Sequence, residues 1–127
     1  MPFQFQTHYT LDQARALLPQ LRQWLGQLRH LREVVFQQEQ QTTARLNSGQ
    51  DLGGEPVHHW LGALVGLRTI ARELHRLGLQ LKDLDRGLVD FPALRDGREV
   101  FLCWEDGEED IGYWHDVDAG YAGREPL

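Results

Sequence analysis

The fold is decided by residues 89–105, which read VDFPALRDGREVFLCWE. Within this stretch, residues 89–94 and 99–105 are rich in β-branched and aromatic side chains, and the Asp96-Gly97 pair between them is a strong hairpin signal. A second turn signal, Asp106-Gly107, is followed by a third short run of the same kind at residues 111–115. The part of the chain after residue 79 is therefore predicted to form a small three-stranded antiparallel sheet.

Both faces of the second predicted strand are apolar. Val100, Leu102 and Trp104 share one face, whereas Phe101 and Cys103 share the other, because successive side chains of a strand point to opposite sides. A sheet that is apolar on both faces needs two covers. We expect helices on one face, and either the C-terminal segment or a second subunit on the other.

Two amphipathic helices are predicted before the sheet. The first begins at Thr10, whose spacing to Gln13 fits a capping box, and apolar side chains then recur every three or four residues as far as Val35. Pro19 lies inside this pattern and predicts a kink rather than an end, since the apolar stripe keeps its phase through it. Residues 37–46 are mostly polar, so this end of the helix should project into solvent or pack only on a partner.

The two helices should pair as a hairpin. Residues 47–56 are turn formers and predict a loop, after which the second helix begins near Pro56 and ends at Gly78, a residue suited to a left-handed cap. The predicted fold class is α+β, with a long Pro-kinked antiparallel helical hairpin over residues 10–78 packed on a small three-stranded antiparallel sheet. We expect residues 1–127 to form a single domain.

Charge is unevenly distributed along the 127 residues, whose net charge is −6. Residues 11–78 carry eight basic and six acidic side chains, whereas residues 79–127 carry five and thirteen. An acidic half argues against nucleic-acid binding there, and no apolar run is long enough for a membrane span. The single cysteine, Cys103, excludes an internal disulfide and, with no secretory signal at the N-terminus, favours a cytoplasmic location.

Candidate chemistry concentrates in residues 83–124. Glu108, His115 and Asp116 combine imidazole with carboxylates, as a divalent metal site would, although their spacing fits no established metal loop. The simpler interpretation is that these acids solvate a hairpin tip. We therefore expect no cofactor, with a divalent metal at these residues as the alternative.

The remaining reactive side chains support weaker hypotheses. Cys103 lies between Leu102 and Trp104 and is expected to be a buried, inert thiol, with a nucleophilic triad of Cys103, His115 and Asp90 as the alternative. The adjacent histidines at residues 58 and 59 are expected to lie on a solvated helix start. A row of arginines is either a solvated helix face or, less simply, a nucleic-acid site: Arg15, Arg22, Arg29 and Arg32.

Several spaced strings together resemble one bacterial family, called domain of unknown function 2203. They are Tyr9-Thr10-Leu11, Ala16-Leu17-Leu18-Pro19, Lys82-Asp83, Gly87-Leu88-Val89-Asp90-Phe91-Pro92, Gly97-Arg98-Glu99-Val100, Leu102-Cys103-Trp104, Gly107-Glu108, Trp114-His115 and residues 120–124. The resemblance covers essentially the whole chain. It implies no established activity, although some members carry a division-protein label.

The family-like strings direct attention to their polar and large residues. These are the candidate ligand-binding residues Asp90, Trp104, Glu108, Trp114, His115 and Arg124. The alternative for this group is a buried ion-pair network in which Arg124 meets Asp90 or Glu108 and fixes the C-terminal tail.

Two functional hypotheses follow from these observations. Nucleotide-binding and hydrolytic motifs are missing, and the apolar helical stripe is wider than one neighbour requires, so we expect a non-enzymatic interaction or scaffolding protein that acts through its helical hairpin. It should form a homodimer or bind a protein partner, without nucleic acid or membrane. The alternative is a small metal- or ligand-binding enzyme whose site combines Asp90, Glu108, His115 and Arg124.

Overall fold

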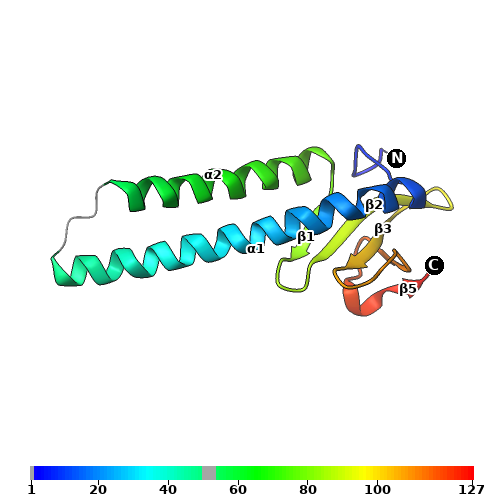
Figure 1. Ribbon diagram of the computed structural model, residues 1–127. Helices are drawn as coiled ribbons and strands as arrows, with labels where there is room; N and C mark the ends of the chain where they lie inside the picture. Colours follow the sequence, from blue (N-terminus) through cyan, green and yellow to red (C-terminus); the bar gives the residue numbers. More distant parts are fainter. Residues whose placement is uncertain (1, 50–53) are drawn as a thin grey trace.

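The computed structural model describes residues 2–49 and 54–127 and shows an α+β architecture, with two helices followed by a sheet (Figure 1). The helices are α1 (Leu11–Ser48) and α2 (Glu55–Arg76), and a 3₁₀ turn, η1, spans Tyr121–Gly123. The strands are β1 (Gln80–Asp83), β2 (Leu88–Arg95), β3 (Arg98–Glu105), β4 (Tyr113–Asp116) and β5 (Glu125–Pro126). The predicted α+β class is thereby confirmed.

The sheet has five strands, so the prediction of three was wrong. All pairs are antiparallel, in the order β1-β2-β3-β4-β5, and the three predicted strands form its centre. The two strands that were missed, β1 and β5, are the edges. An edge strand has one neighbour and one open side, so it needs neither length nor a strong apolar pattern: β1 has four residues, β5 has two, and β5 includes Pro126.

The capping residues predicted for the two helices are present. Thr10 and Gln13 form both hydrogen bonds of a capping box, and Gly78 adopts a left-handed φ of 75° where the chain leaves α2. α1 continues through Pro19, as expected. The predicted loop at residues 47–56 lies partly outside the described residues, but residues 47 and 48 belong to α1 and α2 begins at Glu55.

The two helices approach closely because a glycine faces a leucine. A Cβ atom on Gly66 of α2 would lie 2.9 Å from Cδ1 of Leu31 in α1. Only a residue without a side chain allows this spacing unless Leu31 moves. The contact joins the helices near the middle of the hairpin and leaves the ends farther from the sheet to extend beyond it (Figure 1).

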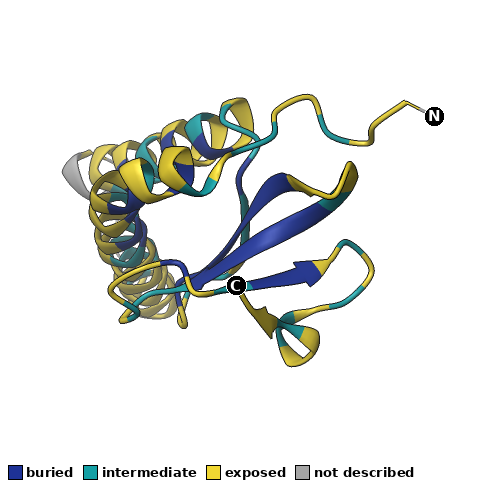
Figure 2. Ribbon diagram, turned by 90° about the vertical axis from the view of Figure 1, so that its right-hand side faces the viewer, coloured by how far each residue is buried: buried dark blue, intermediate teal, exposed yellow. Residues whose placement is uncertain are grey.

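The main core lies between the N-terminal half of α1, the end of α2 and one face of the sheet, which we call the inner face. In α1 the buried side chains run from Ala14 to Leu28, and among its residues none after Leu28 is buried. The inner-face side chains in this core are Val89, Phe91, Ala93, Val100, Leu102, Trp104 and Trp114. Figure 2 shows the central strands buried along most of their length beneath helices whose outer sides are exposed.

The opposite, outer face of the sheet is covered by both ends of the chain. Near the N-terminus, Phe5 packs on Phe101 with ring centroids 5.2 Å apart. Near the C-terminus, the Arg124 guanidinium lies 3.9 Å from the ring centroid of Tyr113. The predicted C-terminal cover is thus present, whereas the contribution of the N-terminal segment was not foreseen.

One glutamate fastens the N-terminal segment to the sheet. Gln4 and Phe5 donate their backbone N–H groups to the carboxylate of Glu99 over 2.7 and 2.8 Å, and His8 Nε2 donates to the same carboxylate over 2.9 Å. Tyr9 then donates its backbone N–H to the Pro92 carbonyl over 2.7 Å. We call residues 3–8 the strap, because they cross the outer face and are tied to its edge.

Neither helix meets the requirements for spanning a bilayer: in the described part of the chain, no helix combines the necessary length with sufficient apolar character.

Candidate polar site

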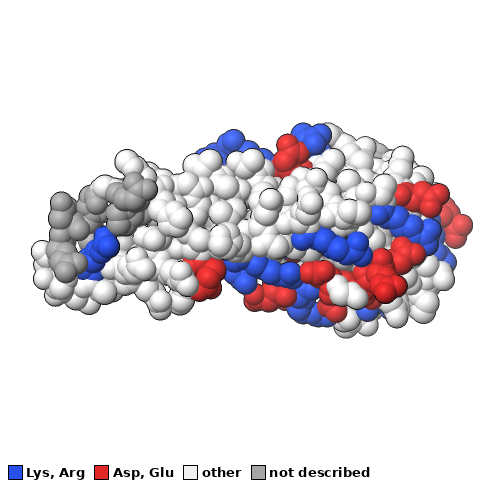
Figure 3. All heavy atoms as spheres, in the orientation of Figure 1, with Lys and Arg blue, Asp and Glu red and all other residues white. Residues whose placement is uncertain are grey.

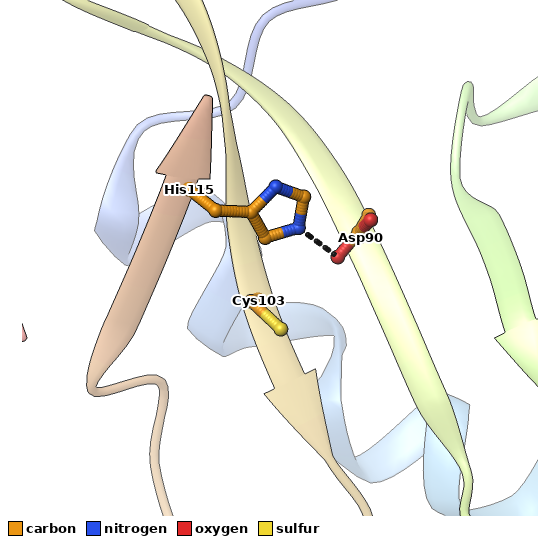
Figure 4. Close-up of side chains that lie close together, drawn as sticks. All are labelled: Asp90, Cys103 and His115. Carbon is orange, nitrogen blue, oxygen red and sulfur yellow. Dashed lines mark hydrogen bonds and ion pairs between the residues drawn. The ribbon is translucent and has the colours of Figure 1, made fainter. Parts of the chain in front are cut away.

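Three polar side chains meet on the outer face of the sheet, one from each central strand. Asp90 of β2 lies directly opposite Cys103 of β3, and His115 of β4 lies opposite Phe101, one diagonal step from Cys103. Figure 4 shows the imidazole pointing across β3 towards the Asp90 carboxyl, with the Cys103 sulfur beside both. Asp90, Cys103 and His115 have exposed fractions of only 2%, 0% and 3%.

The hydrogen bonds of His115 fix which nitrogen faces the carboxyl. Nδ1 lies 2.8 Å from the Asp116 carbonyl oxygen, which can only accept, so Nδ1 carries a hydrogen. Nε2 therefore faces Asp90 Oδ1, 3.1 Å away. A hydrogen bond at this point needs one proton between the two atoms, which means either an imidazolium with a carboxylate or a neutral imidazole with a carboxylic acid.

Burial disfavours charge throughout this group. It raises the pKa of Asp90 above the usual aspartate value, against the opposing attraction of His115 and Lys82. Burial, followed by the negative charge of Asp90, raises the pKa of the Cys103 thiol to about 12. A free Cys103 is thus a thiol at neutral pH, in agreement with the prediction of an inert, buried side chain.

Glu108 and Arg124 form a contact beside this group, which Arg124 reaches through the Cys103 sulfur. Glu108 Oε1 accepts from the backbone N–H of Glu105 over 2.8 Å and from Arg124 Nη1 over 3.2 Å, and the Glu108 carbonyl accepts from Trp104 Nε1 over 2.9 Å. These contacts shape the loop after β3 and tie the C-terminal segment to it. This is the alternative network in which Arg124 meets Glu108.

The six candidate ligand-binding residues therefore separate into three groups. Asp90 and His115 form the buried pair, Glu108 and Arg124 form the loop contact, and Trp104 and Trp114 lie in the inner-face core. The predicted metal candidates Glu108, His115 and Asp116 do not lie together either. Asp116 follows His115 on a strand and so points to the other side, where it is exposed and pairs with Arg98 over 2.9 Å.

Comparison with protein families gives a match over residues 7–127 to the family described as Uncharacterized conserved protein (DUF2203). The chain belongs to this family. The resemblance drawn from the spaced strings is thereby confirmed. Neither the curated proteins nor the solved structures that were compared with the chain contain a match.

Cys103 is the member of this polar group that sequence reasoning undervalued. The signal was present, since a two-residue turn at Asp96-Gly97 pairs Arg95 with Arg98 and, counting outward, Asp90 with Cys103. The position of His115 offered no such signal, because the loop between β3 and β4 is longer and does not fix a register by its length.

The arginine row of this DUF2203 chain faces the acidic loops of its own sheet. Arg15 pairs with Asp110 over 2.8 Å, Arg29 with Asp106 over 2.8 Å, and Arg32 with Asp85 over 2.7 Å. Arg22 donates to the backbone carbonyls of the loop at residues 108 and 109. The row and its acidic neighbours run side by side in Figure 3, so several acids of the sheet region are paired with arginines of α1.

Proposed function

We propose that this DUF2203 member is a non-enzymatic interaction protein that pairs with a second copy of itself through its helical hairpin. The proposal rests on the distal hairpin, defined as residues 33–48 of α1 and 57–67 of α2. Among the described residues, eight large apolar side chains are exposed, and the distal hairpin holds five of them, with exposed fractions of 40–64%. The five are Phe36, Leu46, Val57, Leu61 and Val65.

Three of these side chains form a ridge on α2. Val57, Leu61 and Val65 are spaced by four residues, which places them one above another on the same side of a helix. A contiguous apolar ridge on a helix is typical of a surface that becomes buried in an assembly, whereas scattered single residues are ordinary. Phe36, Thr43 and Asn47 also line an open hollow along the distal end of α1.

The distribution of charge favours a second copy as the occupant. In Figure 3 most charged side chains lie over the sheet end, and few lie over the described part of the distal hairpin. The distal hairpin offers little charge with which to attract an acidic or basic partner, and little with which to repel its own copy. Antiparallel pairing of two hairpins would also place the two acidic sheet regions at opposite ends of the dimer, where their repulsion is smallest.

The same proposal includes the finer sequence predictions. A bacterial cytoplasmic protein fits a chain whose one cysteine, Cys103, is a buried thiol. A bend of α1 near Pro19 fits the loss of one backbone donor there. The absence of a nucleic-acid partner fits an arginine row that is occupied by the chain's own acidic loops.

Sedimentation equilibrium over a range of concentrations tests the proposal. The wild-type chain should sediment as a dimer, and Val65→Glu should shift it towards a monomer, because a charge at a position that is 64% exposed costs little within one chain but much in an apolar interface. Leu94→Glu is the matched control, since Leu94 is exposed on β2, away from the hairpin. A wild-type chain that stays monomeric, or a Val65→Glu chain as dimeric as Leu94→Glu, contradicts the proposal.

The enzymatic alternative receives no comparable support. It required Asp90, Glu108, His115 and Arg124 in one accessible site, whereas Asp90 and His115 are only 2% and 3% exposed and Glu108 is held by the Glu105 backbone N–H and by Arg124. A group sealed from solvent in this way has no approach for a substrate.

A further inference from the structure

We propose that Asp90, Cys103 and His115 bind one divalent transition-metal ion of the zinc class, through a carboxylate oxygen, the thiolate sulfur and imidazole Nε2. The three donor atoms already lie within 4.8 Å of one another, and this is the group of possible metal ligands that the described residues bring together. The inference goes beyond the proposed pairing of hairpins and does not depend on it, because the site lies at the other end of the molecule.

The distances need only a small adjustment. Zinc bonds of about 2.0–2.3 Å in a tetrahedral site place pairs of ligand atoms roughly 3.3–3.8 Å apart. His115 Nε2 and Asp90 Oδ1 are 3.1 Å apart, so they would separate slightly, while the sulfur would move closer by at most about 1 Å. A rotation of the Cys103 and Asp90 side chains provides movements of this size without any change in strand register.

The orientation of His115 is the one that metal sites require. A ligating histidine usually donates its second ring N–H to a carbonyl or carboxylate, which fixes the ring and leaves the other nitrogen for the ion. Here Nδ1 donates to the Asp116 carbonyl over 2.8 Å, and Nε2 is directed at the other two donors. The backbone of β4 thus holds the ligand nitrogen in place before any ion arrives.

The combination of donors selects the class of ion. Thiolate and imidazole together favour zinc and its softer neighbours over magnesium or calcium, which prefer oxygen ligands. A divalent ion with one thiolate, one carboxylate and one neutral imidazole has no net charge. On binding, the ion would displace the proton shared by Asp90 and His115 and the proton of the Cys103 thiol. The bound group would then be neutral, so its burial would not carry the cost of an isolated charge.

The neighbouring cations do not compete for the ligands. Arg124 lies close enough to bond the Cys103 sulfur, but its charge is shared with Glu108 over 3.2 Å, and the Lys82 ammonium lies over the Phe101 ring, 5.8 Å from the centroid. The strap closes the other side, since Phe5 covers Phe101 and Phe101 lies 5.5 Å from the His115 ring. An ion held by these three side chains would join β2, β3 and β4, and a water molecule would fill its fourth tetrahedral position.

Refolding the full chain with cobalt tests the site. The protein is unfolded in denaturant with reductant and chelator, freed of both metal and chelator, and refolded with Co²⁺, so that slow entry into the closed site cannot hide binding. The expected result is one cobalt per chain, a thiolate-to-cobalt charge-transfer band and displacement of cobalt by Zn²⁺. Since Cys103 is the one cysteine in the sequence, such a band can come from no other residue.

Variants show which residues hold the ion. Cys103→Ser should abolish the band, and Asp90→Asn should weaken binding by at least about a hundredfold, since even outer-shell changes cost 10- to 100-fold. Asp116→Asn is the matched control, because it alters the neighbour of His115 on the opposite side of β4 and should leave affinity unchanged. A second control, the double change His58→Gln and His59→Gln, removes the adjacent histidines of α2 and should also leave it unchanged.

The wild-type result alone can overturn the inference. A refolded wild-type chain that binds no stoichiometric cobalt, or binds it without the thiolate band, shows that these three side chains are not a metal site, whatever the variants do. Retention of the band in Cys103→Ser, or equal losses of affinity in Asp90→Asn and Asp116→Asn, overturns it as well.

Discussion

The two halves of α1 differ in what holds them in place. From Leu11 to Leu28 the helix buries one side against the inner face of the sheet, and its arginine row binds the loops beside that sheet. Beyond Leu28, no side chain among the remaining described residues of α1 is buried; Arg29 and Arg32 still pair with the loops of the sheet, and past them the helix packs along α2. One continuous helix therefore combines a firmly packed half with a half that retains apolar side chains for another surface.

This contrast shows that helical pattern and burial carry different information. Both halves satisfy the local requirements of a helix, but only the N-terminal half is matched by a sheet face of similar apolar character. Substitutions at the sheet end should therefore change the stability of the chain, whereas those in the distal hairpin should change its association.

Removing one aromatic side chain from the sheet end and one from the distal hairpin should give the largest difference in the free energy of unfolding. Trp104→Ala empties a position with 0% exposure and should lower the free energy of unfolding by about 3–5 kcal/mol. Phe36→Ala, in the distal hairpin at 53% exposure, should change it by less than about 0.5 kcal/mol in the monomer. Urea unfolding of both variants at low protein concentration measures the two values, and similar losses would remove the contrast.

A pair of glycines tests how tightly the turn after β1 packs on Asp106 in the loop after β3. Gly87 and Gly97 both have a left-handed φ, 67° and 78°, but a Cβ on Gly87 would lie 2.4 Å from the Asp106 Cβ, whereas one on Gly97 meets open space. Gly97→Ala should cost about 1 kcal/mol from backbone strain alone, and Gly87→Ala about 2 kcal/mol or more.

Thermal unfolding of the two alanine variants gives the difference directly. If Gly87→Ala is no less stable than Gly97→Ala, then the close contact with Asp106 is absent in solution.

Removing one arginine of the row should have a smaller effect on the free energy of unfolding. Arg29 donates to Asp106 over 2.8 Å and to two backbone carbonyls of the turn before β2, so Arg29→Gln should destabilise the chain by about 1 kcal/mol, a figure reduced for partial solvent exposure. Arg45→Gln, in the last turn of α1, should have no measurable effect. Urea unfolding at low and high salt distinguishes them, since only the Arg29 contribution should weaken as salt increases.

Acid should detach the strap from the sheet, and this is the smallest expected change in stability. Although burial opposes it, the donors from His8, Gln4 and Phe5 hold the pKa of Glu99 below its usual value. A lowered pKa means that this stabilisation is complete above the ordinary glutamate range and is lost as pH falls through the folded-state pKa. The amide resonances of Gln4 and Phe5 should therefore shift towards unfolded positions on acidification.

Glu99→Gln provides the control for the strap. Its Gln4 and Phe5 resonances should no longer respond to pH in this range. A wild-type strap whose amides stay unchanged down to the pH at which the whole chain unfolds would contradict the assignment of Glu99 as its anchor.

The parts of the fold that could be predicted are those set by local chemistry. Thr10 with Gln13 defines the start of α1, Gly78 the end of α2, and Asp96-Gly97 the central hairpin. The edge strands β1 and β5 could not be found, because their few residues become strands only through pairing with neighbours already in place. The strap escaped notice for the same reason, since its order depends on Glu99, far away in the sequence.

The candidate site was half predictable. Asp90 and Cys103 follow from the turn between their strands, whereas His115 joins them through a longer loop whose geometry depends on Asp110 and its bond to Arg15. The Glu108 and Arg124 contact was foreseen as an alternative to a ligand site. Attraction between acids and cations is expected in a loop contact and in a functional site alike. Only the folded positions of Glu108 and Arg124 decide between the two interpretations.

The cover of the outer face has a consequence for biosynthesis. Phe5 and Arg124 lie on the same side of the sheet, yet the ribosome makes Phe5 long before Arg124. The hairpin, the inner face and the strap can assemble while the chain is still emerging, but the part of the outer face beside Tyr113 stays uncovered until Arg124 leaves the exit tunnel. During that interval Cys103 lacks the neighbouring Arg124 side chain, so a pause before Arg124 is made is when this thiol is most prone to be oxidised.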